Sequence, residues 1–383
     1  MRRMLTMLRN LRGTLSSKGT LSCKGTLSLL AVLGVLAASC ERRPLEDLSN
    51  THYVRVYVNE DILNVTQGFY NPDYARPAYD SPQIMRIVLA DPQTGLTRAD
   101  RYLRTIGHDE RGTYYEGYVI ADPGEYDVFA YNFDTEVTLI NHPNDFSKAF
   151  AYTNEIASHL RTRLYSRFLT KAPAPDDKIV YDADNLFVAR SRGVQVPYSN
   201  KIDTLRTVQG DYFEAESLVK YYYLQVRVKN IRYAISASSL LDGMSGSAQL
   251  SSGLMNEDDP VTVYFEMIPG GESQAAGIAP VKGDSTAGST DDMVIIYTTF
   301  GTFGKIPSLE SNLSITFDFT TVYGQPYFET FDITDLFLTE DAIVRQWLLI
   351  DKTIVIPDPP KGSSGGFRPG VDEWGDVSTD III

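Results

Sequence analysis

The chain has 383 residues and a formal net charge of −14, with 24 tyrosines, 17 phenylalanines and only two cysteines. The negative charge excludes nucleic acid and bare anionic lipid as expected partners, because both repel an acidic surface. Two cysteines exclude a dense disulfide framework, so buried aromatic and aliphatic side chains must supply the stability.

An apolar run that begins at Leu27 ends in small residues and a cysteine, Ala37-Ala38-Ser39-Cys40, and only basic charges precede it. The run is too short to cross a bilayer as a permanent helix, and this order is typical of a secretory signal with a lipoprotein cleavage site. We expect residues 1–39 to be a signal peptide, cut between Ser39 and Cys40. A diacylglycerol thioether on Cys40 and acylation of the new N-terminus would then hold the protein on a membrane. The alternative is a secreted protein, since Ala37-Ala38-Ser39 also suits the ordinary signal peptidase.

Removal of residues 1–39 defines the mature chain. Its formal charge is −20, because the lost segment holds six basic residues and no acidic one. The 344 residues that remain exceed what one hydrophobic core usually serves, which predicts two domains. Cys23 is discarded and Cys40 carries lipid, which leaves no thiol for a disulfide, a zinc site or a nucleophile. We expect a lipidated tether at residues 40–51 before the first domain.

The first domain is expected at residues 52–215 and begins with an alternating strand. In Tyr53–Val58 the valines share one face, while the tyrosines and Arg55 share the other. The same alternation predicts strands at Ile84–Leu89, Tyr114–Ile120 and Tyr126–Tyr131. Asp122-Pro123-Gly124 predicts an antiparallel hairpin between the last two, and Asp91–Gly95 predicts a turn that closes the strand before it.

One segment of this domain has helical spacing. Between Thr153 and Leu169, apolar residues recur every four positions, and Thr153 and Asn154 are capping residues at its start. The apolar residues are Ile156, Leu160, Leu164 and Phe168. This pattern predicts an amphipathic helix that lies on the first domain.

A polar stretch from Arg190 to Glu216 predicts the domain boundary, and the second domain is expected at residues 216–383. Tyr222–Lys229 alternate as a long opening strand. Ser236–Ser252 is rich in Ser, Gly and Leu and predicts a short helix or crossover, while Pro269–Asp292 predicts a mobile loop. Further strands are expected at Val261–Ile268, Val294–Phe300, Leu313–Phe319, Tyr327–Ile333 and Lys352–Ile356, with a turn at Tyr323–Pro326. Together these elements favour an all-β fold of two tandem antiparallel β-sandwiches, with one short helix on the first.

No sequence motif indicates catalysis. Gly243-Met244-Ser245-Gly246-Ser247 comes within one residue of a nucleophile elbow, but a serine stands where the second glycine is needed. Gly301–Lys305 is too short for a phosphate-binding loop and predicts a plain turn. The four histidines are far apart and lack metal-ligand spacing, so ordinary surface or half-buried positions are expected. They are His52, His108, His142 and His159.

Carboxylates and exposed aromatics leave two weaker possibilities. Asn256–Asp259 and Asp291-Asp292 could bind calcium through oxygen ligands, although neither has EF-hand spacing, and solvated acidic turns are the simpler interpretation. Tyr70, Tyr74 and Tyr79 lie in a proline-containing loop and could stack on sugar rings; packing of the loop against the sandwich is the alternative.

The signal and Cys40 occur together with four further segments, namely Asp91–Gly95, Pro123–Asn132, Leu240–Gly246 and the ending Gly365–Val377 before Asp380–Ile383. In this combination the chain resembles the Bacteroidales fimbrillin-like lipoproteins, in particular the minor fimbrium anchoring subunits and a related group of uncharacterised lipoproteins. The resemblance implies transthyretin-like sandwiches in both domains and a lipid in the outer membrane, and it implies no catalytic residue. Polymerising fimbrillins lose an N-terminal strand to an arginine-specific protease, whereas cutting after Arg42 or Arg43 here would free the protein from its lipid.

We therefore expect a cell-surface lipoprotein of the outer membrane, held by lipid on Cys40, that anchors or assembles fimbriae through contacts with fimbrial subunits. We expect no enzymatic activity, cofactor or metal. The alternative is a surface lipoprotein that binds glycans or nutrients. The terminal segment Val377–Ile383 is either donated as a strand to a neighbouring subunit or paired within its own domain, because three consecutive isoleucines at a free end would favour aggregation.

Overall fold

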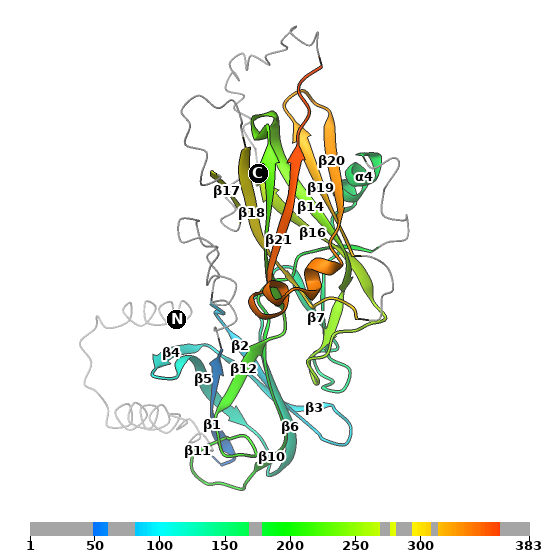
Figure 1. Cartoon of the computed structure of the whole chain (residues 1–383). Coiled ribbons are helices and arrows are strands. Elements are labelled where there is room, and N and C mark those ends of the chain that lie inside the picture. The colour runs from blue at the N-terminus through cyan, green and yellow to red at the C-terminus, as the bar shows by residue number, and fades with distance from the viewer. Residues whose placement is uncertain are drawn as a thin grey trace, which may run out of the picture. The chain divides into compact units, whose positions relative to one another are not determined.

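The structure is a computed structural model, and it describes residues 49–59, 81–167, 178–268, 276–280, 293–307 and 313–360. All of these except Ser49 belong to one compact unit, Asn50–Ile383. Strands make up most of the described chain and are arranged in four sheets (Figure 1). The fold is therefore all-β, as predicted, and its sheets pack as sandwiches.

The first sheet contains nine strands in the order β3-β2-β6-β10-β12-β1-β5-β4, with β11 beside β1. Its strands are β1 (Thr51–Val58), β2 (Met85–Ala90), β3 (Thr97–Leu103), β4 (Thr105–Asp109), β5 (Gly112–Ile120), β6 (Gly124–Asn132), β10 (Phe187–Val196), β11 (Asp203–Thr204) and β12 (Phe213–Ser217). Neighbours are antiparallel except that β11 and β12 run parallel to β1. A separate three-stranded sheet contains β7 (Thr138–Asn141), β8 (Phe150–Thr153) and β15 (Ser247–Gln249).

The two halves of the nine-stranded sheet enclose one core. Val54 and Val56 of β1 lie in the same buried cluster as Ile87 of β2 and Phe129 of β6. The ring of Phe129 packs against that of Phe146, with 5.0 Å between the ring centroids. These side chains are wholly or almost wholly buried, so the alternation seen in the sequence separates core from surface.

Two further sheets form the second sandwich. The four-stranded sheet has the order β17-β18-β13-β21 and the five-stranded sheet the order β20-β19-β14-β16-β9. The strands are β9 (Ile179–Tyr181), β13 (Lys220–Lys229), β14 (Ala234–Ser245), β16 (Pro260–Ile268), β17 (Ala276–Pro280), β18 (Met293–Thr302), β19 (Ser314–Thr321), β20 (Pro326–Asp332) and β21 (Trp347–Val355). Phe265 of β16 and Phe300 of β18 stack across the interface at 4.2 Å, which shows that the sheets face one another.

The predicted hairpin across Asp122–Gly124 is wrong. Both edges of β5 are already occupied, by β1 over seven residue pairs and by β4. Both edges of β6 are likewise occupied, by β2 and β10. The turn therefore carries the chain from one part of the nine-stranded sheet to another.

The predicted helix exists but is shorter and packs elsewhere. Helix α4 spans Ser158–Arg167, because Phe150–Thr153 form β8 instead. The prediction placed it on the first sandwich. Its apolar residues instead lie in a cluster with side chains of β9, β14 and β16 in the five-stranded sheet. The cluster contains Ile156, Leu160 and Leu164 with Ile179, Leu240 and Tyr264.

Two other predicted segments differ from the structure. Residues 236–252 are not a helix or crossover, since they contain most of β14 and all of β15. Within the expected loop at residues 269–292, Ala276–Pro280 form β17 beside β18. The predicted turns are confirmed at Asp91–Gly95 and between β19 and β20, where Gly324 has φ 81°.

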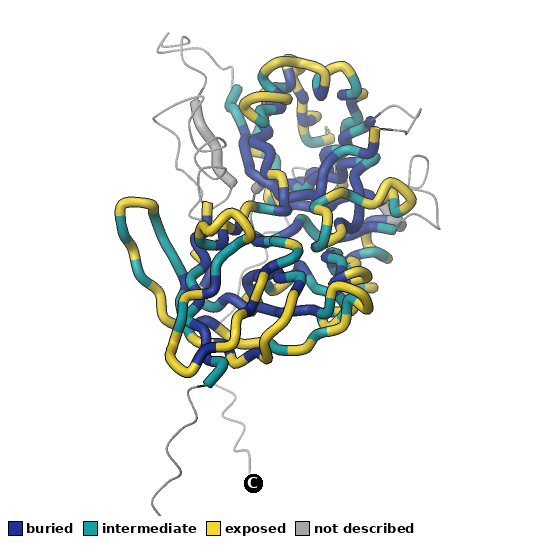
Figure 2. Tube along the Cα trace, turned by 90° about the horizontal axis from the view of Figure 1, so that it is seen from below, coloured by how far each residue is buried: buried dark blue, intermediate teal, exposed yellow. Residues whose placement is uncertain are grey.

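Short helices complete the described chain, at η2 (Ile231–Tyr233), η3 (Asp335–Leu338) and η4 (Asp341–Arg345). Exposed residues lie mostly in connections such as these, in β3 and β4 and at strand ends, while the other strands carry most of the buried residues. Buried stretches of the chain trace run through the inside of the fold, and exposed stretches form outer loops (Figure 2). The predicted boundary after residue 215 falls within β12, which is followed by β13 in the second sandwich, and it stays a prediction.

Candidate functional surface

The outer face of β1 and β5 gathers tyrosine, arginine and carboxylate side chains. Tyr53, Arg55 and Tyr57 alternate with core valines on β1, and the register sets Glu116 beside Arg55 and Tyr114 beside Tyr57. A two-residue period places all five on one side of the sheet. We refer to this group, together with the neighbouring Arg111, Arg206, Tyr212 and Glu214, as the tyrosine–arginine face.

Arg55 is the centre of this face. Its guanidinium donates to the hydroxyls of Tyr53 and Tyr57 at 3.1 and 3.2 Å, and to the carboxylate of Glu116 at 2.9 Å. It also lies 3.8 Å from the centroid of the Tyr114 ring. Burial opposes its charge, but the hydrogen bonds outweigh burial and raise the pKa of Arg55 above its ordinary value. The positive charge is therefore fixed and its donors are directed.

Tyr53 and Tyr57 each donate a hydrogen bond to a carboxylate. Tyr53 donates to Glu116, and Tyr57 donates to Asp109 at 2.7 Å. Burial, followed by the bond to Glu116, raises the pKa of Tyr53 to about 12, so its hydroxyl stays protonated. The bond from Tyr57 lowers the pKa of Asp109. Neither Tyr53 nor Asp109 is therefore poised to exchange a proton near neutral pH.

The solvent side of the face consists of Arg111, Glu214, Arg206 and Tyr212. Arg111 pairs with Glu214 at 2.6 Å, and Arg206 lies 3.6 Å from the ring centroid of Tyr212. Tyrosine and arginine are the residue types that most often carry binding energy in protein interfaces. The arrangement can bind a partner by stacking and hydrogen bonding. The sequence showed the alternation on β1, but the partners on β5 depend on long-range pairing.

A second feature is an acidic cleft of about 480 Å³, whose lining includes Asp134, Glu136, Asp182 and Asp184. Burial, and next the charge of Asp184, raise the pKa of Asp182 to about 7. Asp184 accepts hydrogen bonds from the backbone amides of Val137 and Thr138. Tyr221 is the one aromatic residue in this lining, so the cleft does not offer a row of rings for stacking on sugars. Sequence reasoning missed this cleft because its carboxylates come from two distant segments.

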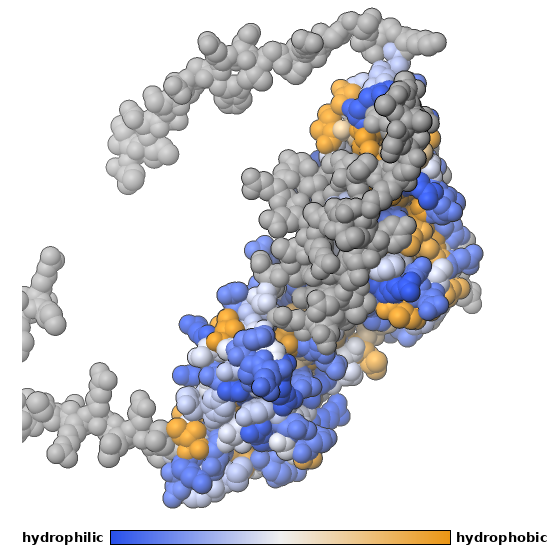
Figure 3. Space-filling view, turned by 60° about the vertical axis from the view of Figure 1, so that its left-hand side comes forward, coloured by the Kyte–Doolittle hydropathy of each residue, from blue (hydrophilic) through white to orange (hydrophobic). Residues whose placement is uncertain are grey.

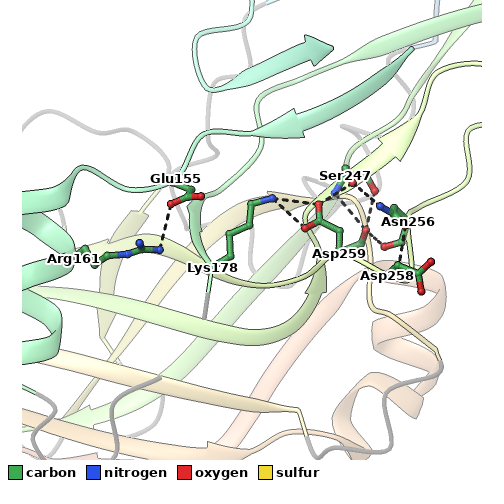
Figure 4. A network of polar contacts seen from close by, with 8 residues as sticks. Glu155, Arg161, Lys178, Ser247, Asn256, Asp258 and Asp259 are labelled. Atoms are coloured by element: carbon green, nitrogen blue, oxygen red, sulfur yellow. Dashed lines mark hydrogen bonds and ion pairs between the residues drawn. The ribbon is translucent and has the colours of Figure 1, made fainter. Parts of the chain in front are cut away.

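The near-elbow motif is a structural turn. Ser245 is 2% exposed, and its Oγ lies 2.8 Å from the carbonyl oxygen of Ser247 and 2.7 Å from that of Asn256. A nucleophile would need an exposed hydroxyl beside a base, and this one is enclosed by backbone carbonyls. Figure 4 shows the neighbouring residues, in which Lys178 and Ser247 converge on the carboxylate of Asp259.

In the acidic turn at Asn256–Asp259, one carboxylate is paired with a lysine and two others are exposed. Lys178 binds both carboxylate oxygens of Asp259, at 3.1 and 3.3 Å, and Ser247 donates to one of them at 2.9 Å. Glu257 and Asp258 are exposed. The pairing of Asp259 with a lysine favours the solvated-turn interpretation over calcium. Asp291-Asp292 lie outside the described residues.

The remaining predicted motifs bring no chemistry together. Gly301–Lys305 ends β18 and turns against β14, where Gly304 accepts a hydrogen bond from the amide of Ser245. His52 is buried in β1, and burial lowers its pKa. Across the ranges that the structure describes, no group of three or more His, Cys, Asp or Glu side chains is placed to hold a metal ion.

Strand edges are the other surfaces relevant to assembly. In the four-stranded sheet, β21 lies at one edge with β13 as its neighbour. Its register shifts after Ile350, and the residues at the shift, Asp351 and Lys352, are exposed and charged. Charges and irregularities at an edge discourage pairing with another chain. Elsewhere on the surface, apolar side chains form separate patches among hydrophilic ones (Figure 3).

Several predicted site residues lie outside the described residues. These are Ser39, Cys40, Tyr70, Tyr74, Tyr79 and the segment Val377–Ile383. Within the described ranges, no helix is both long enough and apolar enough to cross a bilayer.

Comparisons with known proteins give one family and several distant relatives. The sequence profile described as "Domain of unknown function (DUF5119)" matches residues 39–266. A protein of Bacteroides ovatus, provisionally named fimbrium anchoring subunit Fim4B, is 22% identical over 202 residues, which are 52% of this chain and 52% of that protein. The aligned part thus spans about half of that relative. This match confirms the resemblance to fimbrium anchoring subunits that the sequence indicated.

The chain is also similar, at low sequence identity, to solved structures, two of which follow. A crystal structure from Bacteroides ovatus, provisionally described as an adhesin, has a TM-score of 0.46 and 18% identity, with 84% of this chain and 97% of that chain covered. The fimbrial anchor protein Mfa2 of Porphyromonas gingivalis has a TM-score of 0.40 and 14% identity, with 80% and 90% covered. Because the family profile covers more than half of the sequence, the chain belongs to the family described as the domain of unknown function DUF5119.

Proposed function

We propose that the mature chain is an outer-membrane lipoprotein that anchors or assembles fimbriae through protein–protein contacts. The observation that carries this proposal is the match along 202 residues to a protein named as a fimbrium anchoring subunit. The relatives described above are named as fimbrial and adhesion proteins rather than as enzymes. A role in binding is consistent with the hydrogen-bonded polar groups of the tyrosine–arginine face.

Lipid on Cys40 is the proposed attachment to the cell. The apolar run before Cys40 and the small residues up to Ser39 support cleavage at that position. One acyl chain gives only marginal membrane binding, whereas two or three on one residue give stable anchoring at about 0.8 kcal/mol per buried methylene. The folded unit would then stand on a tether of about ten residues.

The tyrosine–arginine face is the proposed contact for a fimbrial subunit. Arg111 and Glu214 are its most exposed charged members, and Tyr212 lies beside them. Arg55 and its partners hold the underlying rings in place, so little conformational entropy is lost when a partner binds. An ordered face of this kind supports a protein partner more than a glycan.

Strand exchange is the finer form of this proposal. The segment Val377–Ile383 would either complete a neighbouring subunit or pair within the second sandwich, and we favour internal pairing. The charged edge of β21 supports the view that this edge does not accept a strand from another chain.

We also propose that the chain divides into domains at residues 52–215 and 216–383, and limited proteolysis followed by mass spectrometry would test this boundary.

Affinity capture of the tagged, lipidated protein from cross-linked cells of its source bacterium tests the role. We expect mass spectrometry to identify fimbrial subunits, and we expect their yield to fall in Arg111→Ala. Arg227→Ala is a matched control, because Arg227 also makes an exposed ion pair, 2.7 Å from Asp351, but lies outside the face. Capture of transporter or glycosidase components without fimbrial subunits would contradict the proposal and favour the nutrient-binding alternative.

A further inference from the structure

Exposed apolar side chains surround the point where the described chain enters the first sheet. Thr51 opens β1 and pairs with Ile120 of β5, while the amide of Asn50 donates to the carbonyl oxygen of Ser199 at 2.9 Å. On the other side of β1, His52 pairs with Asp203 of β11. Next to these partners lie four exposed residues, which we call the β1 patch: Tyr118 (52% exposed), Ile120 (68%), Tyr198 (72%) and Ile202 (43%).

The backbone register brings the patch together. Val119 is buried between Tyr118 and Ile120, so these two side chains share the outer face of β5. The ring of Tyr118 contacts that of Tyr53 at 5.7 Å, which holds it in place. Exposed apolar residues that gather at one place on a surface, unlike ones that are scattered singly, mark a site of contact with a protein or a membrane.

The β1 patch lies close in the sequence to Cys40, and this favours a membrane as the surface that covers it. Nine residues lie between Cys40 and Asn50, which is ten residues further along the chain. Because an extended chain spans at most about 3.6 Å per residue, the patch lies within about 35 Å of a lipid on Cys40. Tyrosine rings are enriched at membrane interfaces, where one end of the side chain is apolar and the other is hydrated.

The charges near the patch agree with contact through apolar groups. Lys201 and Asp203 lie 3.8 Å apart, and Asp122 follows the end of β5 as an exposed residue. Charges of both signs sit close together here, so attraction to a charged headgroup is not the expected source of binding. The chemistry that fits is the boundary between headgroups and acyl chains.

We propose that the β1 patch rests on the lipid surface of the membrane to which the chain is anchored. This inference rests on the proposed function, because lipid on Cys40 supplies the first attachment and the patch the second. The fold then stands on the membrane at the N-terminal end of β1. The second contact limits rotation about the tether and so gives a bound partner a defined approach.

A fluorescence experiment on the lipidated chain tests the contact. The chain contains only Cys23 and Cys40, of which one is removed and the other acylated under the proposal, so a single introduced cysteine takes the label. An environment-sensitive dye is placed at Tyr198→Cys or Ile202→Cys in the patch. The control is Val322→Cys in the turn between β19 and β20, whose exposure (53%) lies between those of Ile202 and Tyr198. Each protein is reconstituted into phosphatidylethanolamine and phosphatidylcholine vesicles, whose headgroups carry no net charge, with and without a nitroxide-labelled lipid.

Groups that enter the headgroup and acyl boundary by about 5–10 Å come within reach of the quencher, so we expect about a two-fold loss of fluorescence at positions 198 and 202. No loss is expected at position 322. Flotation of the vesicles reports anchoring independently. Protein that floats but is quenched equally at all three positions, or at none, overturns the inference and leaves anchoring intact. Protein that does not float overturns the proposed anchoring, and the inference with it.

Discussion

Replacing Asp182 by asparagine is predicted to remove a pH dependence from the stability of the fold. Asp182 follows β9 and lines the acidic cleft, where burial and the charge of Asp184 raise its pKa from 3.8 to about 7. The folded protein therefore holds a proton that the unfolded chain releases between these values. Stability contributed in this way is present at low pH and is lost as the pH rises through 7.

The size of the effect follows from the shift. A displacement of about three pH units, at about 1.4 kcal/mol per unit, corresponds to about 4 kcal/mol in total. Between pH 5 and pH 8 the wild-type protein should lose about 3 kcal/mol of unfolding free energy through this group. An asparagine at this position keeps a carbonyl oxygen that can accept hydrogen bonds from the backbone amides of residues 182 and 301, but it carries no charge. Asp182→Asn should therefore gain stability relative to wild type as the pH rises.

Urea unfolding of both proteins at pH 5, 6, 7 and 8 measures this difference. Asp258→Asn is the matched control, since Asp258 is an exposed carboxylate in a turn. The difference between Asp182→Asn and wild type should grow with pH, level off above pH 7 and exceed the difference for Asp258→Asn, whose carboxylate is exposed. A difference for Asp182→Asn that does not change with pH would refute the reasoning.

Three further substitutions test the packing and the candidate surface by the same measurement. Gly246→Ala should cost about 1–3 kcal/mol of unfolding free energy, because the added Cβ would lie 2.5 Å from Val261 Cγ1 and 2.8 Å from Asp259 Oδ2. Gly124→Ala is the control and should cost less, because the nearest atom to its Cβ is 3.7 Å away. Equal costs for the two substitutions would contradict this account. Arg55→Ala leaves Asp109 and Glu116 without their shared cation and should cost about 1–3 kcal/mol. The exposed pair lost in Arg227→Ala should cost less than about 1 kcal/mol, so a larger loss there than at Arg55 would argue against the central role of Arg55. Leu164→Ala should cost about 2–5 kcal/mol, because Leu164 of α4 packs against side chains of β9, β14 and β16. Ile343→Ala is the control and should cost less than about 0.5 kcal/mol, because Ile343 is exposed. An equally small cost for Leu164→Ala would show that α4 does not pack on the sheet.

Local pattern was sufficient for individual strands and insufficient for their partners. The alternation in Tyr53–Val58 and Tyr222–Lys229 predicted β1 and β13. A strand with one face toward the core shows this alternation in its own sequence, so it can be predicted without knowing its partners. The Asp122–Gly124 turn has hairpin chemistry, yet β5 pairs with β1 from sixty residues earlier in the chain. Strand pairing depends on contacts with side chains of neighbouring strands, and these strands lie far away in the sequence. A short stretch of sequence therefore does not reveal its partner.

Composition misled where tertiary packing overrides it. Residues 236–252 are rich in Ser and Gly, but β16 and β19 flank Leu240 and Leu241 on both sides and hold them in a strand. The four-residue spacing of Ile156, Leu160 and Leu164 did predict a helix, though not the sheet that it covers.

The candidate surface was the hardest part to predict. Tyr53, Arg55 and Tyr57 were visible as one face of a strand, but their carboxylate partners Asp109 and Glu116 come from β4 and β5. The raised pKa of Asp182 likewise depends on burial that only the fold creates.

Metabolic labelling with palmitate tests the central claim, attachment through a single acylated cysteine, most directly. Cells expressing the tagged full chain or Cys40→Ser are grown with labelled palmitate, and both label and protein are followed in the outer-membrane fraction. We predict that the wild-type chain is labelled and sediments with the membrane, and that Cys40→Ser is unlabelled and leaves the membrane fraction. An unlabelled wild-type chain, or a Cys40→Ser chain that stays on the membrane in wild-type amount, would contradict the account.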